Sequence, residues 1–142
     1  NGEPIGYAVG VPLAYYLEHH DHFLGSQDIL ATSGINLSEY YYLADVIILA
    51  QHRGKGLSVQ LFKELEQYAY NNNFAYVSFV SEAYEYHPLK PKGYQDLHAM
   101  WRHLGYCETG IVLRGIWNTL QVHGDAQDQD HPLPFWVKKL EN

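Results

Sequence analysis

A short polar stretch with two glycines interrupts an apolar run near the middle of the chain. It reads Gln-His-Arg-Gly-Lys-Gly over residues 51–56 and is followed by Leu57 and Ser58. Glycines let the backbone approach a ligand without a Cβ in the way, and the amides of such a turn can point at an anion. Arg53 and Lys55 add positive charge, and Ser58 adds a hydroxyl. These residue types predict a site for a phosphate group.

The elements on either side of this turn follow from the hydrophobic pattern. Residues 40–49, YYYLADVIIL, combine aromatic and β-branched residues, which is typical of a buried strand. From Leu57 to Ala69 an apolar residue recurs at every fourth position, which predicts an amphipathic helix ended by the asparagines at 71–73. A phosphate at the turn would therefore meet the first amides of a helix, which lack partners within the helix.

Two further strands and a long connection surround this unit. Residues 5–11 and 74–80 are predicted strands, and the second completes a strand–helix–strand unit whose strands run roughly parallel. Residues 12–39 lie between the first strand and the central one. They show no clear period and are predicted to form a long loop or insertion that could hold a short helix.

The C-terminal part is predicted to contain one helix and two strands. The helix covers residues 96–104, with Asp96 near its start and Gly105 just past its end. The closing strands lie near residues 111–122 and 135–140. The polar connector between them, HGDAQDQDHP, has nothing apolar to pack and is predicted to be exposed.

Composition limits the domain organisation and the class of partner. The 142 residues, 46% of them hydrophobic, suit one domain over residues 1–142. The net charge of −7 disfavours nucleic acid and favours an amine substrate. One cysteine cannot form an internal disulfide, and no apolar run approaches the roughly 20 residues that span a bilayer. These features predict a soluble, cytoplasmic protein without a membrane partner.

Two common phosphate-binding motifs do not fit the glycine turn. A Walker loop needs Ser or Thr directly after Gly-Lys, and here Gly56 follows Lys55. The dinucleotide fingerprint needs a third glycine where this chain has Val59. A plain turn between a strand and a helix is the remaining general alternative.

The motif Gln51-x-x-Gly54-x-Gly56 does resemble the Gln/Arg-x-x-Gly-x-Gly/Ala signature of the GNAT acetyltransferase superfamily. The order of strand, motif, helix, strand and a helix ending in LGY is also similar to that family. The resemblance covers residues 2 to about 140. It implies an α/β (α+β) fold with a mixed, mostly antiparallel twisted sheet, a central strand–turn–helix–strand unit, and a C-terminal helix plus two strands.

The resemblance also implies that the chain lacks the family's first strand, first two helices and second strand. The predicted strand at residues 5–11 is similar to the family's third strand. An N-terminally incomplete domain is therefore expected, which a missing N-terminal segment or a homodimer would complete.

Acetyl-CoA as co-substrate, with no metal, is the cofactor that the resemblance implies. Backbone amides of the turn would bind its pyrophosphate, namely those of Gln51, His52, Arg53, Gly54, Lys55, Gly56, Leu57 and Ser58. The preceding strand would offer backbone groups to the pantetheine arm and the thioester carbonyl through Val46, Ile47 and Ile48. An N–H near Ile48 would then stabilise the tetrahedral oxyanion.

The sequence departs from the family at a residue close to the CoA sulfur. Family members often have a Tyr there, and the matching segment WRHLGY has Trp101, whose indole cannot serve as that acid. Trp101 is therefore assigned to the cofactor site. Tyr94 and His98 are the nearest substitutes as general acid, and the alternatives of packing for Tyr94 and solvation for His98 stay open.

Carboxylates near the ends of the two central strands are candidates for the base that accepts the amine proton. Asp45 lies on the central strand, and Glu82 and Glu85 follow the next strand. They fall where the two strands would separate and admit the acceptor. Most exposed carboxylates only solvate a surface, so this alternative stays open for each.

A cluster of imidazoles and one carboxylate lies in the long connection. It reads His19-His20-Asp21-His22, residue types that suit zinc or nickel. A second spaced ligand set is missing from the sequence, so a polar loop is favoured over a metal site.

Two functions from different classes follow. The first is an acetyl-CoA-dependent N-acetyltransferase that moves an acetyl group directly to a primary amine of a small molecule or peptide. The second is a catalytically silent CoA-binding module with a regulatory or assembly role. The segments HPLKPKGYQDLHAMWRHLGY and PFWVKKL are similar to a GNAT subgroup found fused to carbon–nitrogen hydrolase domains. In that subgroup Trp101 would be a shared trait, and activity would remain plausible.

Overall fold

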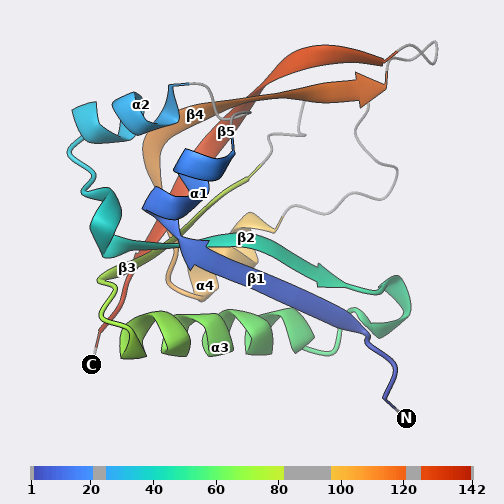
Figure 1. Ribbon diagram of the computed structural model, residues 1–142. Coiled ribbons are helices and arrows are strands. Elements are labelled where there is room, and N and C mark those ends of the chain that lie inside the picture. The colour runs from blue at the N-terminus through green and yellow to red at the C-terminus, as the bar shows by residue number, and fades with distance from the viewer. Residues whose placement is uncertain (1, 21–24, 82–96, 121–125, 142) are drawn as a thin grey trace.

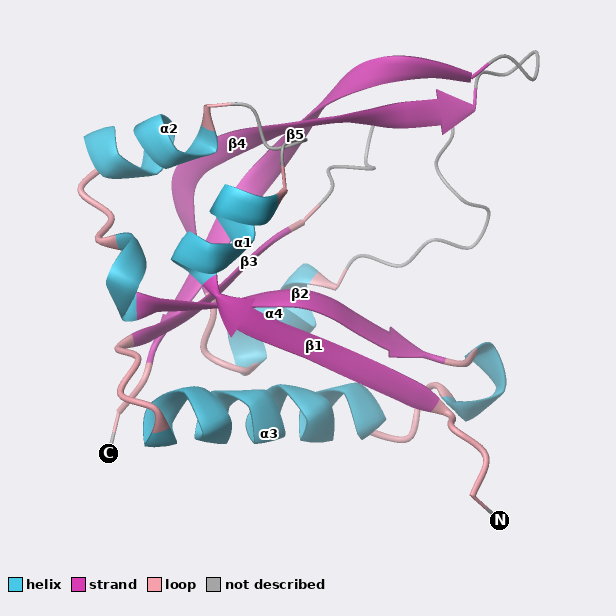
Figure 2. Cartoon of the chain, in the orientation of Figure 1, coloured by secondary structure: helices cyan, strands magenta, loops and turns pink. Residues whose placement is uncertain are grey.

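One five-stranded sheet with helices on both faces forms the protein (Figures 1 and 2). The computed structural model describes residues 2–20, 25–81, 97–120 and 126–141, without the side chains of 116–120 and 126–131. The strands are β1 (Gly6–Pro12), β2 (Tyr40–Ile48), β3 (Tyr76–Val80), β4 (Cys107–Leu120) and β5 (Ala126–Lys139). The helices are α1 (Leu13–His19), α2 (Ser26–Thr32), α3 (Leu57–Asn71) and α4 (His98–His103), with 3₁₀ turns at Leu37–Glu39 and Ala50–His52.

The strand order is β1-β2-β3-β5-β4, in which β2 and β3 are parallel and the other neighbouring pairs are antiparallel. The expected fold class, a mixed and mostly antiparallel sheet built around a strand–turn–helix–strand unit, is therefore confirmed. The C-terminal helix and two closing strands are present as expected.

Alternate side chains of β2 pack on opposite faces of the sheet, as strand geometry requires. Tyr41 and Leu43 join a core cluster under α3 and α4, whereas Tyr40 and Tyr42 join a second cluster under α1 and α2. Figure 1 shows α3 along one face of β1 and β2 and α1 on the other, with α2 beside β4. The sheet is thus covered on both sides along its central part.

The C-terminal ends predicted from sequence for two helices are confirmed by backbone geometry, whereas the predicted start at Asp96 lies outside the described residues. Asn73 has a φ of 68°, and the Phe74 N–H reaches back to Ala69 O at 3.0 Å, so the asparagines end α3. Gly105 has a φ of 99° just past α4. The longest described helix, α3, has 15 residues, and no helix in the described part of the chain is long and apolar enough to cross a membrane.

The connection at residues 12–39, expected to be a long loop or insertion that could hold a short helix, contains two short helices. Leu13 of α1 and Leu30 of α2 have no exposed surface and pack in the cluster beneath them. Each helix has seven residues, about two turns, which is too short to show a helical period in the sequence. Tertiary packing, and not a repeating pattern, therefore stabilises them.

The exposed connector expected at residues 123–132 is also partly wrong. Strand β5 begins at Ala126, and its register with β4 runs from Leu120↔Ala126 to Arg114↔Pro132. A strand of a hairpin is held by backbone hydrogen bonds, which need no apolar side chains. The polar composition therefore did not prevent the strand.

The central strands β2 and β3 diverge, and this divergence positions the candidate site. Their parallel pairing covers Tyr40–Tyr42 on β2 and Tyr76–Ser78 on β3, written as Tyr40↔Tyr76 to Tyr42↔Ser78. Beyond that point β2 stays paired with β1, while β3 stays paired with β5. A register shift between Val9 and Gly10 places an extra residue, Ala44, in β2, and a bulge of this kind bends a strand.

Candidate functional site

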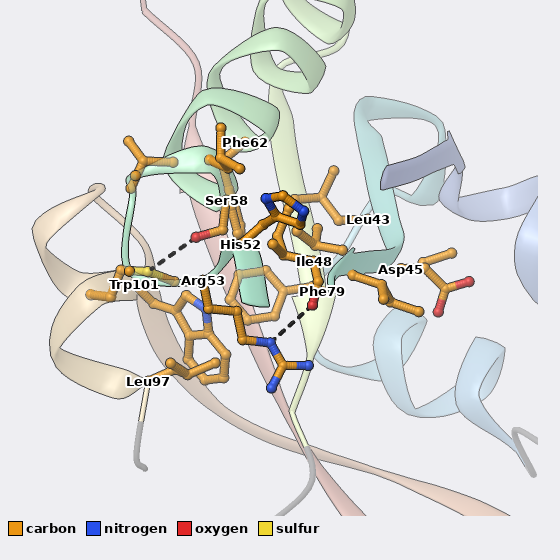
Figure 3. A pocket seen from close by; sticks show the side chains of 18 of the residues that line it. Leu43, Asp45, Ile48, His52, Arg53, Ser58, Phe62, Phe79, Leu97 and Trp101 are labelled. Carbon is orange, nitrogen blue, oxygen red and sulfur yellow. Dashed lines mark hydrogen bonds between the residues drawn. The ribbon is translucent and has the colours of Figure 1, made fainter. Parts of the chain in front are cut away.

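A cavity of about 1080 Å³ lies where β2 and β3 diverge, bounded by the turn after β2, the start of α3, and α4. Eleven residues predicted from sequence as site residues line it: Asp45, Val46, Ile47, Ile48, His52, Arg53, Gly54, Gly56, Leu57, Ser58 and Trp101. In Figure 3, side chains from the turn, α3, α4 and the central strands surround the cavity. The side chains of Gln51 and Lys55 are exposed and do not line it.

The glycine turn has the conformation that its glycines were expected to permit. Gly54 and Gly56 have φ values of 79° and 76°, a left-handed region that strains other residues. A Cβ built on either glycine would meet no atom within 4 Å, so both face open space. Gly56 directly precedes α3, whose first amides lack acceptors within the helix. The turn can therefore present several amides to an anion.

Backbone groups of β2 face the gap that β3 leaves. The Leu49 N–H donates to Ile5 O at 2.8 Å, so the N–H and C=O of Leu49 point to β1. Peptide groups alternate along an antiparallel strand, and Ile48 lies opposite Gly6 in the intervening position. Ile48 and, two residues earlier, Val46 therefore direct their N–H and C=O groups into the cavity, where a ligand could take the place of a neighbouring strand.

Two side-chain hydrogen bonds link elements around the cavity (Figure 3). The Arg53 Nε donates to Ile48 O at 2.9 Å, which connects the turn to the end of β2. The Ser58 hydroxyl donates to the Met100 sulfur at 3.9 Å, which connects the first turn of α3 to α4. Thioether sulfur is a weak acceptor, so the Ser58 hydroxyl can turn to a phosphate oxygen at little cost.

Trp101 forms part of the cavity wall together with buried aromatic rings. Its ring packs edge-on against Phe79 at 4.9 Å between centroids and against Trp136 at 5.1 Å. Sequence reasoning missed Phe79 and seven other lining residues: Leu43, Ala44, Val59, Phe62, Val80, Leu97 and Met100. Phe62 on the apolar stripe of α3 was the clearest available signal, since this stripe continues the wall from the turn.

Of the predicted catalytic residues that the structure describes, Asp45 lines the cavity and His98 does not. Asp45 lines the cavity, but its exposed carboxylate points away from Trp101 and Arg53 (Figure 3). Asp45 also contributes, after burial and Tyr16, to raising the pKa of Tyr42. The ring of His98 is tilted against two indoles, with ring centroids 5.5 Å from Trp101 and 5.1 Å from Trp136. His98 does not line the cavity.

Three of the predicted proton-transfer candidates are not placed by the structure. Tyr94, Glu82 and Glu85 lie outside the described residues.

The histidine-rich segment divides between described and undescribed residues. The Nδ1 atoms of His19 and His20 lie 2.8 Å from Tyr15 O and 2.9 Å from Tyr16 O, and each ring stacks on the tyrosine one turn back. Asp21 and His22 lie outside the described residues. Within the residues that are described, no three His, Cys, Asp or Glu side chains come close enough to hold a metal ion.

The diverging strands β2 and β3 and the glycine turn at the start of α3 have the arrangement that the resemblance to the GNAT superfamily implied. The family model described as "Acetyltransferase (GNAT) family" matches residues 1–88, which is more than half of the chain. The chain therefore belongs to the GNAT acetyltransferase family. No curated protein matches the sequence.

Solved structures show the same fold at low sequence identity. The ribosomal-protein-alanine N-acetyltransferase from Brucella melitensis is 22% identical, with a TM-score of 0.54 over 98% of this chain and 64% of its own. A GNAT family acetyltransferase from Elizabethkingia anophelis with acetyl-CoA bound is 14% identical, with a TM-score of 0.56 over 99% of this chain and 71% of its own.

A third similar structure has the same relation to the chain. It is the ribosomal-protein-S18-alanine N-acetyltransferase from Escherichia coli, which is 12% identical, with a TM-score of 0.54 over 100% of this chain and 65% of its own. The chain spans 62 to 66% of the length of the first three structures that it matches.

Proposed function

We propose that the protein binds acetyl-CoA in the cavity between β2, β3, α3 and α4 and transfers the acetyl group directly to a primary amine. One observation carries the proposal. The turn amides at Gly54 and Gly56 and the outward peptide groups of Val46 and Ile48 border the same cavity. An anion and an extended, amide-containing arm can therefore be bound side by side, as CoA requires.

The pyrophosphate would lie on the turn, where unpaired amides and the N-terminal end of the α3 dipole favour negative charge. Ser58 would add a hydroxyl, released from its weak bond to the Met100 sulfur. The pantetheine arm would run along β2 and pair with the N–H and C=O of Val46 and the N–H of Ile48, whose C=O accepts from Arg53. The acetyl carbonyl would then accept an N–H from β2 near Ile48, which stabilises the oxyanion as it forms.

The transfer step needs a neutral amine and a route for two protons. The amine nitrogen attacks the thioester carbon, a C–N bond forms, and collapse of the tetrahedral intermediate breaks the C–S bond. One amine proton passes to a base, for which Asp45 and Glu82 are our candidates. The departing thiolate takes a proton from an acid, for which Tyr94 and His98 are our candidates.

The acceptor is proposed to be a primary amine of a small molecule or of a peptide. The names of the Brucella and Escherichia structures describe alanine acetylation on ribosomal proteins, which is chemistry on a peptide amine. Primary amines are protonated in neutral solution and therefore arrive as cations. The net charge of −7 would attract such an acceptor.

The proposal is tested by calorimetric titration of the chain with acetyl-CoA. A Gly54→Glu and Gly56→Glu double variant should lose binding, because its carboxylates repel the pyrophosphate. Gly34→Glu is a matched control, since Gly34 also has a left-handed φ, of 82°, and also faces open space, but lies beyond α2. Absence of binding by the folded parent chain, or equal losses in the double variant and the control, would contradict the proposed site.

Trp101 favours one alternative, a CoA-binding module without catalysis. It lines the cavity and cannot supply the proton that a Tyr would supply there. This alternative predicts acetyl-CoA binding with no release of free CoA above background across a panel of amines. A thiol-detection assay with and without each amine separates the two functions, and one accepted amine would exclude the silent module.

A further inference from the structure

The side chain of Arg53 is exposed, but its Nε lies against the end of β2. Its Nε donates to the carbonyl oxygen of Ile48, five residues earlier, at 2.9 Å (Figure 3). This bond closes a short loop that contains the 3₁₀ turn Ala50–His52. It fixes the start of the glycine turn relative to the last residue of β2.

The Ile48 carbonyl needs a partner from outside the sheet. This carbonyl points away from β1, because the N–H of the same peptide group, that of Leu49, donates to Ile5 O. The neighbouring strand β3 pairs with β2 only as far as Tyr42↔Ser78. Arg53 therefore supplies the donor that a parallel strand would have supplied, at the point where the strands diverge.

The two parts of the proposed CoA site are joined at this bond. A ligand must contact the turn amides around Gly54 and the peptide groups of β2 at the same time. Holding the two in a fixed relative position before binding removes part of the ordering cost that the ligand would otherwise meet. We propose, on the basis of the function proposed above, that Arg53 is a positioning residue that preorganises the cofactor site through Ile48 O.

A competing role for Arg53 is direct attraction of a phosphate by its positive charge. The two roles depend on different atoms, since positioning needs the N–H at the Nε position and attraction needs the guanidinium charge. Glutamine has its amide nitrogen the same number of bonds from Cα as the Nε of arginine, and it carries no charge. Methionine has a similar length but neither the donor nor the charge.

The test compares Arg53→Gln with Arg53→Met by calorimetry with acetyl-CoA at low and high salt. Positioning predicts that Arg53→Gln binds like the parent, whereas Arg53→Met binds about tenfold more weakly at both salt concentrations. Attraction of a phosphate predicts equal weakening in both variants, reduced by salt because salt screens exposed charges. Equal weakening, or no change in either variant, would overturn the proposal.

A second measurement keeps this proposal separate from the proposed function. Amide hydrogen exchange of the ligand-free protein should be faster over residues 49–56 in Arg53→Met and unchanged in Arg53→Gln. Lys55→Met is the matched control, since Lys55 is an exposed residue of the same turn, as Arg53 is, but lies outside the cavity lining. Failure of the parent to bind acetyl-CoA would contradict the proposed function, while the exchange result would still decide whether Arg53 holds the turn.

Discussion

The hydroxyl of Tyr106 donates a hydrogen bond to Oε2 of Glu66 at 2.8 Å and thereby ties the start of β4 to α3. The other carboxylate oxygen, Oε1, accepts from Lys138 of β5 at 2.7 Å. The Tyr106 side chain is almost completely buried, with 1% of its surface exposed. One carboxylate therefore links three elements on the face of the sheet that carries the proposed cofactor site.

Replacing Tyr106 with Phe should lower the free energy of unfolding by about 1–2 kcal/mol. The substitution leaves one oxygen of Glu66 without its donor while the ring still fills the core. Urea unfolding followed by circular dichroism measures the change. Tyr68→Phe is the control, since Tyr68 on α3 is 53% exposed, and a loss as large in the control would show that the Tyr106 hydroxyl has no special role.

Stability should fall steeply in alkaline solution. Burial, followed by the charge of Glu66 and the hydrogen bond to it, raises the pKa of Tyr106, and burial, followed by Tyr16 and Asp45, raises the pKa of Tyr42. Unfolded tyrosines ionise near a pKa of about 10, whereas these two stay protonated in the folded protein. The unfolded state thus binds fewer protons above that pH, and folding stability decreases there by up to about 1.4 kcal/mol per pH unit for each residue.

The alkaline effect is measured by unfolding titrations at increasing pH. Tyr106→Phe should reduce the slope of unfolding free energy against pH above about pH 10, because one titrating group is removed. An unchanged slope in this variant would show that Tyr106 does not stay protonated in the folded state.

Trp101 should report acetyl-CoA binding by fluorescence. It lines the cavity, whereas the Trp136 side chain has no exposed surface. Acetyl-CoA should change the emission of the parent chain, and Trp101→Phe should lose most of that change. The same variant should bind more weakly by about 1 kcal/mol in calorimetry, through lost ring contact. A full fluorescence change in the variant would place the ligand elsewhere.

Gly10→Ala should destabilise the edge pair of strands. A Cβ at this position would lie 2.3 Å from the Cε2 atom of Tyr41, whose ring is buried. The ring must shift, at a cost of about 1–3 kcal/mol in unfolding free energy. Adding Tyr41→Leu removes the clash, so the double variant should lose less than the sum of the two single losses. If the losses of unfolding free energy in the two single variants simply add in the double variant, the Tyr41 ring is not what destabilises Gly10→Ala.

Tyr94→Phe and His98→Ala should each slow acetyl transfer by about 10²-fold if that residue is the general acid, without loss of acetyl-CoA affinity. Free CoA release with an accepted amine gives the rate, and calorimetry gives the affinity. His103→Ala, at an exposed position of the same helix α4, is the control for His98. Unchanged rates in both variants would remove both residues as acid candidates.

The sequence predicted the central unit because the information for it is local. Glycines at 54 and 56 permit the left-handed turn, and an apolar residue at every fourth position specifies α3. The terminating residues Asn73 and Gly105 were found for the same reason. The sequence allowed a short helix in residues 12–39 but did not place α1 and α2, because seven residues carry too little pattern and the helices depend on packing against β1, β2 and β4.

What the sequence by itself determined is therefore the glycine turn, the amphipathic α3 and the family to which the chain belongs. The tertiary structure alone decided that β2 and β3 diverge beyond Tyr42, that Trp101 packs against Phe79 and Trp136, and that the Asp45 carboxylate points away from that wall. Each of these depends on contacts between segments far apart in the chain. The spacing of residues within one segment does not predict such contacts, because they depend on how the whole core packs.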